Sequence, residues 1–169
     1  MVAAALTDVV ADPSTWLGLS LSREALTVRF AAASAWILAA LLASLAAPRV
    51  VARASEAMRS NTVQSLLIGA LAHASLALAL ALTVALVRAL VGLPLFALVA
   101  VAGAAVRSCG LAAGFVVVGS AVMRRGLPSA YARLLAGALV AGVLGFVPVV
   151  GPIAWMALAC AGTGGVLVA

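Results

Sequence analysis

The side chains of this chain that are able to do chemistry are few, and they form no catalytic pattern. Every one of the ten strongly basic residues is arginine, and the sequence holds four acidic residues, one histidine and two cysteines. Common enzyme classes need paired carboxylates, a nucleophile beside its base, or a glycine-rich phosphate loop. None of these patterns occurs, and no acidic residue lies in the interior of an apolar run: Asp8, Asp12 and Glu56 lie outside the runs, and Glu24 stands at the start of the first one. We therefore expect a protein that is not an enzyme.

Arg107 is the sharpest feature, because it lies in the middle of a long apolar run. An arginine at the bilayer centre costs at least about 2.5–3.5 kcal/mol and usually faces the bundle interior or a partner. The interiors of the apolar runs contain no Asp or Glu that would pair with it. We predict that Arg107 contacts helix-end carbonyls, a lipid phosphate or a group from another molecule. The alternative is a side chain that snorkels to the interface from a displaced helix.

His73 is the only histidine, and it follows Gly69 by one helical turn. A small residue one turn earlier leaves room for a flat macrocycle, so haem or chlorophyll ligation is one interpretation. A histidine bonded within a helix bundle is the other, and no cofactor is our main expectation. Cys109 and Cys160 form no CxxC motif and no His-Cys cluster, so we expect no metal site and interpret them as small apolar fillers.

The remaining candidate arginines form two groups at the ends of apolar runs. Two runs separate the groups, so the positive-inside rule places both on the cytoplasmic side. Such arginines suit the phosphates of anionic lipids. A nucleic-acid partner is not expected, because no basic stripe with interleaved aromatic residues occurs. The groups consist of Arg49, Arg53 and Arg59, in an expected loop at 48–61, and of Arg124, Arg125 and Arg133, in one at 124–133. The spacing of Arg53, Glu56 and Arg59 would also let them pair on one helical face.

Glycines at helical spacing mark candidate packing faces. Gly110 and Gly114 form a small-x-x-x-small pattern, and Gly137 with Gly142 and Gly145 forms a looser one. Small residues let two helices approach closely in a membrane. These faces predict helix packing, either within the chain or against a second protein.

The composition defines the elements that must position these residues. The 169 residues are 67% hydrophobic and only 8% charged, with a mean hydropathy of +1.32. A water-soluble fold of this length cannot hide so much apolar surface. In a bilayer the choice is between helices and a closed barrel, and unbroken runs rich in Ala and Leu favour helices. We predict an all-α integral membrane protein.

Five apolar runs predict a bundle of about five transmembrane helices. The last two are short and tightly joined through residues 148–152, so they either span the membrane or form a shallow re-entrant hairpin. The third contains no internal proline, which favours one long helix. Residues 1–21 are expected to be a leader or an interfacial segment, and 22–169 the transmembrane domain. The runs cover residues 22–47, 62–91, 94–123, 131–147 and 153–168.

The second half of the chain carries a family resemblance. Its motifs are VGLPLFALV at 91–99, GLAAGFVVVGSAVMRRG at 110–126 and the glycine-rich stretch at 134–169. Over about residues 60–169 these resemble the C-terminal membrane module of bactofilin-like, polymer-forming bacterial proteins. The bactofilin β-solenoid itself is missing, because residues 1–60 hold no strand repeats. The resemblance implies a membrane anchor or scaffold without catalytic residues.

The interpretation we favour is a non-enzymatic structural or accessory subunit, multi-pass in the bacterial inner (cytoplasmic) membrane, that packs against other membrane-protein subunits. The spans lack polar machinery, and what remains is a surface for lipid and for other helices. Three alternatives stay open: a membrane anchor of a bactofilin-like scaffold, a small transporter or channel, and a pigment- or haem-binding subunit that uses His73.

Overall fold

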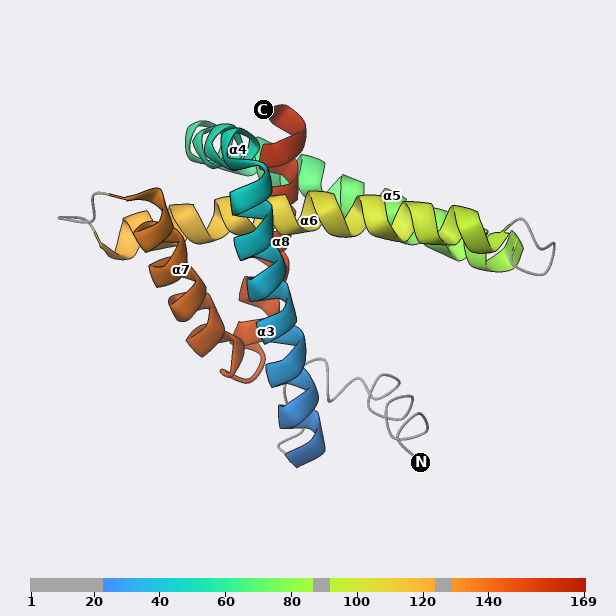
Figure 1. The fold of residues 1–169 in the computed structure, drawn as a ribbon, viewed down its shortest axis with the longest axis horizontal. Coiled ribbons are helices and arrows are strands. Elements are labelled where there is room, and N and C mark those ends of the chain that lie inside the picture. Colours follow the sequence, from blue (N-terminus) through green and yellow to red (C-terminus); the bar gives the residue numbers. More distant parts are fainter. Residues whose placement is uncertain (1–22, 87–91, 124–128) are drawn as a thin grey trace.

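The computed structural model describes residues 23–86, 92–123 and 129–169, and within them the chain is helical without a β-strand (Figure 1). This confirms the all-α prediction for the described part. The expected leader at 1–21, Arg124 and Arg125 lie outside the described residues. The helices are α3 (Arg23–Ala46), α4 (Pro48–Ser60), α5 (Thr62–Leu86), α6 (Gly92–Val122), α7 (Ala130–Gly145) and α8 (Val150–Val168).

Four helices are long and apolar enough to cross a membrane. They provide the stretches Leu26–Ala46, Thr62–Ala85, Gly92–Val122 and Val150–Val168. The α7 helix has 16 residues, about 24 Å at 1.5 Å per residue, so it is shorter than the hydrocarbon core of about 30 Å. The third predicted run is one continuous helix, as expected. The chain thus has the build of a multi-pass membrane protein, and a crossing by α7 stays a prediction.

The polar segment at 48–61, expected as a loop between two spans, is instead largely the helix α4. Pro48 ends α3 and stands at the start of α4, where its missing N–H group has no helical partner to lose. One face of α4 buries Val51, Ala54 and Met58, and the opposite face carries the charged side chains. A helix with one apolar and one charged face suits a membrane interface.

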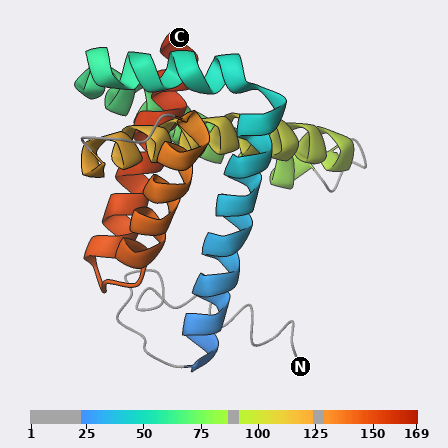
Figure 2. The ribbon, with the colours of Figure 1, turned by 60° about the vertical axis from the view of Figure 1, so that its left-hand side comes forward.

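The helices are not all aligned with one another. In Figures 1 and 2, the axes of α3, α7 and α8 lie broadly along one line, with α7 antiparallel to the other two, while the α5–α6 pair crosses them steeply. The α4 helix lies across the end of the α3, α7 and α8 group (Figure 2). The helices cross at glycines, and contacts between bare backbones lack the side-chain ridges that align neighbouring helices.

The core lies where α3, α4, α6, α7 and α8 meet, and it is built largely from small residues. Its largest fully buried apolar side chains are Leu111, Phe115 and Leu134. The Trp155 ring packs edge-on against Phe115, with centroids 5.8 Å apart. Its indole N–H donates to the Ala141 carbonyl oxygen at 2.9 Å. Trp155 therefore fills the core and satisfies its polar atom there.

Proline positions explain where the predicted boundaries shifted. The predicted breaks at 92–94 and 148–152 partly fall inside helices, because α6 begins at Gly92 and α8 at Val150. Pro94 and Pro152 thus lie in first turns, where proline is tolerated. The link between α7 and α8 holds Val149 at φ 64°, a strained backbone for a β-branched residue. The last two helices form a tight hairpin.

Candidate functional site

The closest helix contact joins α5 and α8 through two glycines. A methyl group added at Gly69 would overlap the backbone carbonyl of Cys160, and one at Gly164 would overlap that of Ser65. The two backbones therefore touch, which only glycine allows. The pairs Ser65 with Gly69 and Cys160 with Gly164 each repeat a small residue after one turn. Among so many small residues, this pattern alone did not identify them.

The α6 helix makes the same kind of backbone contact through glycines with two other helices, α7 and α8. Gly119 of α6 and Gly137 of α7 lie against each other's helix backbone. Gly110 of α6 faces Gly162 and the Thr163 nitrogen of α8, with a built Cβ 2.5 Å from that nitrogen. Of the predicted packing glycines, Gly110 and Gly137 thus lie at backbone contacts within the chain.

The other predicted glycines meet side chains instead of backbone. A Cβ built on Gly114 would lie 2.7 Å from the Leu158 side chain, and one on Gly145 would lie 2.8 Å from the Trp155 indole nitrogen. Both neighbours belong to α8. A Cβ built on Gly142, the fifth predicted glycine, would meet only the Ile37 side chain, at 3.8 Å. The predicted glycines therefore all face other parts of this chain, and sequence reasoning missed Gly69, Gly119, Gly162 and Gly164.

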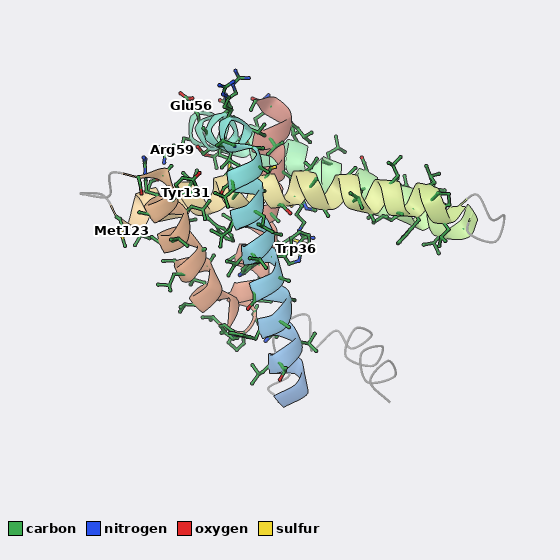
Figure 3. All side chains as sticks on the ribbon, viewed as in Figure 1. Trp36, Glu56, Arg59, Met123 and Tyr131 are labelled. Carbon is green, nitrogen blue, oxygen red and sulfur yellow. The ribbon has the colours of Figure 1, made fainter. Side chains whose placement is uncertain are left out.

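Arg107 lies against an aromatic ring rather than a carboxylate. Its guanidinium carbon is 4.5 Å from the centroid of the Trp36 ring, where α3 crosses α6 (Figure 3). The negative face of an indole ring attracts a guanidinium group, and more strongly away from water. The Arg107 Nε atom is buried and has no hydrogen-bond partner among the described residues. Trp36 had not been singled out from the sequence.

Beside Arg107 lies a cavity of about 310 Å³ between α5, α6 and α8. His73, Arg107 and Thr163 line it together with apolar side chains. The buried Thr163 hydroxyl has no hydrogen-bond partner in the part of the chain that the structure describes. The fold thus brings the predicted residues His73 and Arg107 to one cavity.

His73 is bonded within its own helix. Its Nδ1 atom lies 2.8 Å from the Gly69 carbonyl oxygen, and a carbonyl only accepts, so Nδ1 carries the hydrogen. The Cys160 Sγ atom lies 4.0 Å from the same nitrogen. The backbone of α8 occupies the space beside Gly69. The room for a macrocycle that the Gly69–His73 spacing suggested is therefore used for helix packing.

A second polar cavity, which we call the interfacial arginine cavity, lies between the end of α3, α4, α6 and the first turn of α7. It measures about 260 Å³, and two arginines from different helices line it: Arg59 and Arg133. Arg59 donates from Nη2 to the Ser120 hydroxyl at 2.5 Å. The Arg133 Nε atom is buried without a hydrogen-bond partner among the described residues. Two of the predicted lipid-contacting arginines thus share one site.

The other described arginines of this group stay on the outer face of α4. Arg49 and Arg53 are exposed and do not line the cavity. Glu56 is also exposed, and Figure 3 shows it on the outer side of α4. The spacing of Arg53, Glu56 and Arg59 suggested pairing on one face, but within the described residues no ion pair joins them. Glu56 therefore does not neutralise Arg59.

The arrangement offers binding and packing, and no grouping for catalysis was found in the described ranges. There, no three His, Cys, Asp or Glu residues come close enough to hold a metal ion. No protein family, no curated protein and no solved structure matches this chain.

Proposed function

We propose that this chain is a non-enzymatic accessory subunit of a larger complex in the bacterial cytoplasmic membrane. It packs against a partner's transmembrane helices through the outer half of the α5–α6 pair. We call this part the apolar arm and define it as residues 76–85 of α5 and 92–103 of α6. The single observation that carries the proposal is the way this arm leaves the rest of the molecule (Figure 1).

The arm presents large apolar side chains on its outer surface. Leu78, Leu82, Leu98 and Val101 have exposed fractions of 62%, 57%, 68% and 70%. Inside the arm, Leu76 of α5 packs onto Gly103 of α6. The arm crosses α3, α7 and α8 steeply (Figure 1), so it reaches sideways when those helices span the bilayer. A sideways apolar arm is a surface that a neighbouring subunit can cover.

The buried hydroxyl groups favour this role over a transporter. Ser44, Thr83 and Ser108 each donate to a backbone carbonyl of their own helix, at 2.7 to 2.9 Å. Hydroxyls that bond within their own helix do not line a water-filled path. A transporter or channel needs polar groups that converge on one pathway. These three groups are distributed over three helices and satisfied locally, which supports a packing role. The buried hydroxyls of Ser65 and Thr163 are the exceptions, since neither has a hydrogen-bond partner among the described residues.

The proposal is tested by a substitution that enlarges an exposed side chain of the arm and keeps it apolar. Leu98→Trp keeps the surface of the arm apolar, but the larger ring prevents a partner helix from packing closely against it. Leu139→Trp is the matched control, because Leu139 of α7 is equally exposed, at 72%, and lies away from the arm. Each tagged protein is purified in mild detergent, and the mass of the native complex is measured. We expect Leu98→Trp to lose the partner and Leu139→Trp to keep it.

Two outcomes contradict the proposal. One is a lone protein of the chain's own mass for the unmodified sequence. The other is equal partner recovery with both tryptophan variants. A partner that is a polymer-forming soluble protein supports the alternative of a bactofilin-like anchor. A co-purifying pigment absorption band that disappears in His73→Ala supports the tetrapyrrole alternative.

A further inference from the structure

We propose that the interfacial arginine cavity is a specific site for the phosphate headgroup of one anionic phospholipid. The inference does not depend on the apolar arm or on any partner protein. It rests on the charge, the walls and the position of the cavity.

The cavity gathers positive charge without a counter-ion. Arg59 enters from α4 and Arg133 from α7, and none of the described residues that line the cavity is acidic. Figure 3 shows Arg59 and Tyr131 on the same side, near the end of α6 that carries Met123, with Glu56 farther out. The hydrogen bond of Arg59 goes to a neutral hydroxyl, that of Ser120. An anion between the two guanidinium groups would interact favourably with both.

The first turn of α7 adds to this attraction. Ala130, Tyr131 and Arg133 of that turn line the cavity, and the Ser129 hydroxyl accepts from the Ala132 N–H at 3.2 Å. A helix N-terminus carries about half a positive charge, which favours phosphate. Charge-assisted hydrogen bonds from arginine to phosphate are among the strong ones. The buried and unpaired Nε of Arg133 is a donor ready for such a bond.

The remaining wall identifies the ligand as a lipid rather than a small water-soluble anion. Val51, Val116 and Leu134 line the cavity and suit a glycerol backbone and the first methylenes of acyl chains. With about 260 Å³, the cavity lies near the lower end of ligand pockets, which hold about 300–1,000 Å³. It therefore takes a headgroup, and the acyl chains leave toward the apolar helices.

The position of the cavity matches headgroup depth. It lies where the apolar helix α3 ends and the amphipathic helix α4 begins, at Pro48. An apolar span that meets a helix with a charged outer face marks the boundary between the hydrocarbon and the headgroups. Phosphates of anionic lipids stand at this level.

The test counts lipids that stay bound to the purified protein. The protein is reconstituted in nanodiscs with equal phosphatidylglycerol and phosphatidylcholine, released into detergent, and weighed by native mass spectrometry. Arg59→Gln is compared with Arg53→Gln, which removes the same charge from the same helix but outside the cavity. We expect one retained phosphatidylglycerol for the unmodified protein and for Arg53→Gln. For Arg59→Gln we expect the fraction of protein that retains phosphatidylglycerol to be at least about tenfold lower, in line with loss of a charge-assisted bond.

Further arms separate the lipid from other anions and from misfolding. Arg133→Gln should reduce retention like Arg59→Gln, and an unchanged melting profile of the exposed Arg59→Gln variant shows that folding is intact. Displacement of the lipid by millimolar inorganic phosphate assigns the site to free anions and overturns the proposal. Equal retention in Arg59→Gln and Arg53→Gln, or equal retention of phosphatidylcholine, overturns it as well.

Discussion

Arg107 shows how a single charged side chain is accommodated among apolar helices. Its cost at the bilayer centre is about 2.5–3.5 kcal/mol, and a desolvated contact with an indole ring returns about 2 kcal/mol. The Trp36 ring, 4.5 Å from the guanidinium carbon, therefore offsets most of the cost without a carboxylate. Contact of Arg107 with a lipid or a partner stays a prediction, and its unpaired Nε leaves a donor for it.

The first prediction measures the contact between Arg107 and Trp36. The free energy of unfolding in mixed micelles is determined for Arg107→Leu, for Trp36→Leu and for the double variant. We expect a coupling of about 1–2 kcal/mol between the two residues. As a control, the same set of variants is measured with Trp155→Leu in place of Trp36→Leu. The Trp155 indole N–H donates to the Ala141 carbonyl oxygen, so no coupling with Arg107 is expected. Additive effects of Arg107 and Trp36 would mean that the ring does not stabilise the charge.

The same Arg107→Leu variant also tests the partner hypothesis. Insertion into the membrane should be unchanged or improved, because a costly residue is removed. If Arg107 lies at a subunit interface, the variant recovers less partner from detergent extracts than the unmodified protein does. Equal recovery removes Arg107 from the interface and leaves the apolar arm as the contact.

At the scale of elements, glycines decide which helices touch. The α5–α8 contact at Gly69 and Gly164 and the α6–α7 contact at Gly119 and Gly137 both bring backbones together. Helices in lipid gain little from burying apolar surface, so close packing carries their association. Single methyl groups at these positions should therefore have large effects.

The second prediction compares two Gly→Ala changes in the same chain. At Gly164 the new methyl group would overlap the Ser65 carbonyl, and overpacking of this kind costs about 1–3 kcal/mol. At Gly142 it would meet only the Ile37 side chain at 3.8 Å, and a helical glycine replaced by alanine gains up to about 1 kcal/mol. The free energies of unfolding should differ by about 1–4 kcal/mol.

Both variants are measured by denaturant titration in the same detergent. Far-ultraviolet circular dichroism before the titration checks that the helix content is equal. Equal stability of Gly164→Ala and Gly142→Ala would contradict the close α5–α8 contact. A loss at Gly142 as large as at Gly164 would point to a general intolerance of added volume.

At the scale of the whole molecule, the fold brings the two arginine segments to one place. Arg59 of α4 and Arg133 of α7 line the same cavity, although the segments are separated by two long apolar helices. The positive-inside rule predicted one shared side of the membrane for them. Their proximity supports that prediction, and the identity of the side stays open to experiment.

The third prediction is that both segments react from the cytoplasmic side. Ser60→Cys and Ser129→Cys are introduced separately into a Cys109→Ala, Cys160→Ala background, since Ser60 and Ser129 are both exposed. A membrane-impermeant maleimide is applied to right-side-out and to inverted vesicles. Both positions should label only in inverted vesicles. Labelling of the two positions from opposite sides would contradict both the topology and the shared cavity.

Several features of the fold were predictable because they depend on local sequence. Apolar runs and prolines gave the helices with shifts of a few residues, and Ser129 caps α7 through its hydroxyl. The helix α4 was mistaken for a loop, since its polar composition outweighed the alternation of buried Val51, Ala54 and Met58 with charged residues. Amphipathic helices are recognised by this periodicity rather than by mean hydropathy.

The sequence by itself determined the membrane class and the helical state, because hydropathy and backbone hydrogen bonding act along the chain and need no tertiary contact. It also showed which residues were chemically unusual, above all Arg107, His73 and the arginine groups. Only the tertiary structure decided their partners: Trp36 for Arg107, the backbone of α8 beside Gly69, and one cavity for Arg59 and Arg133. Many small residues offer many equivalent packing faces, so the choice among them depends on contacts between helices distant in sequence.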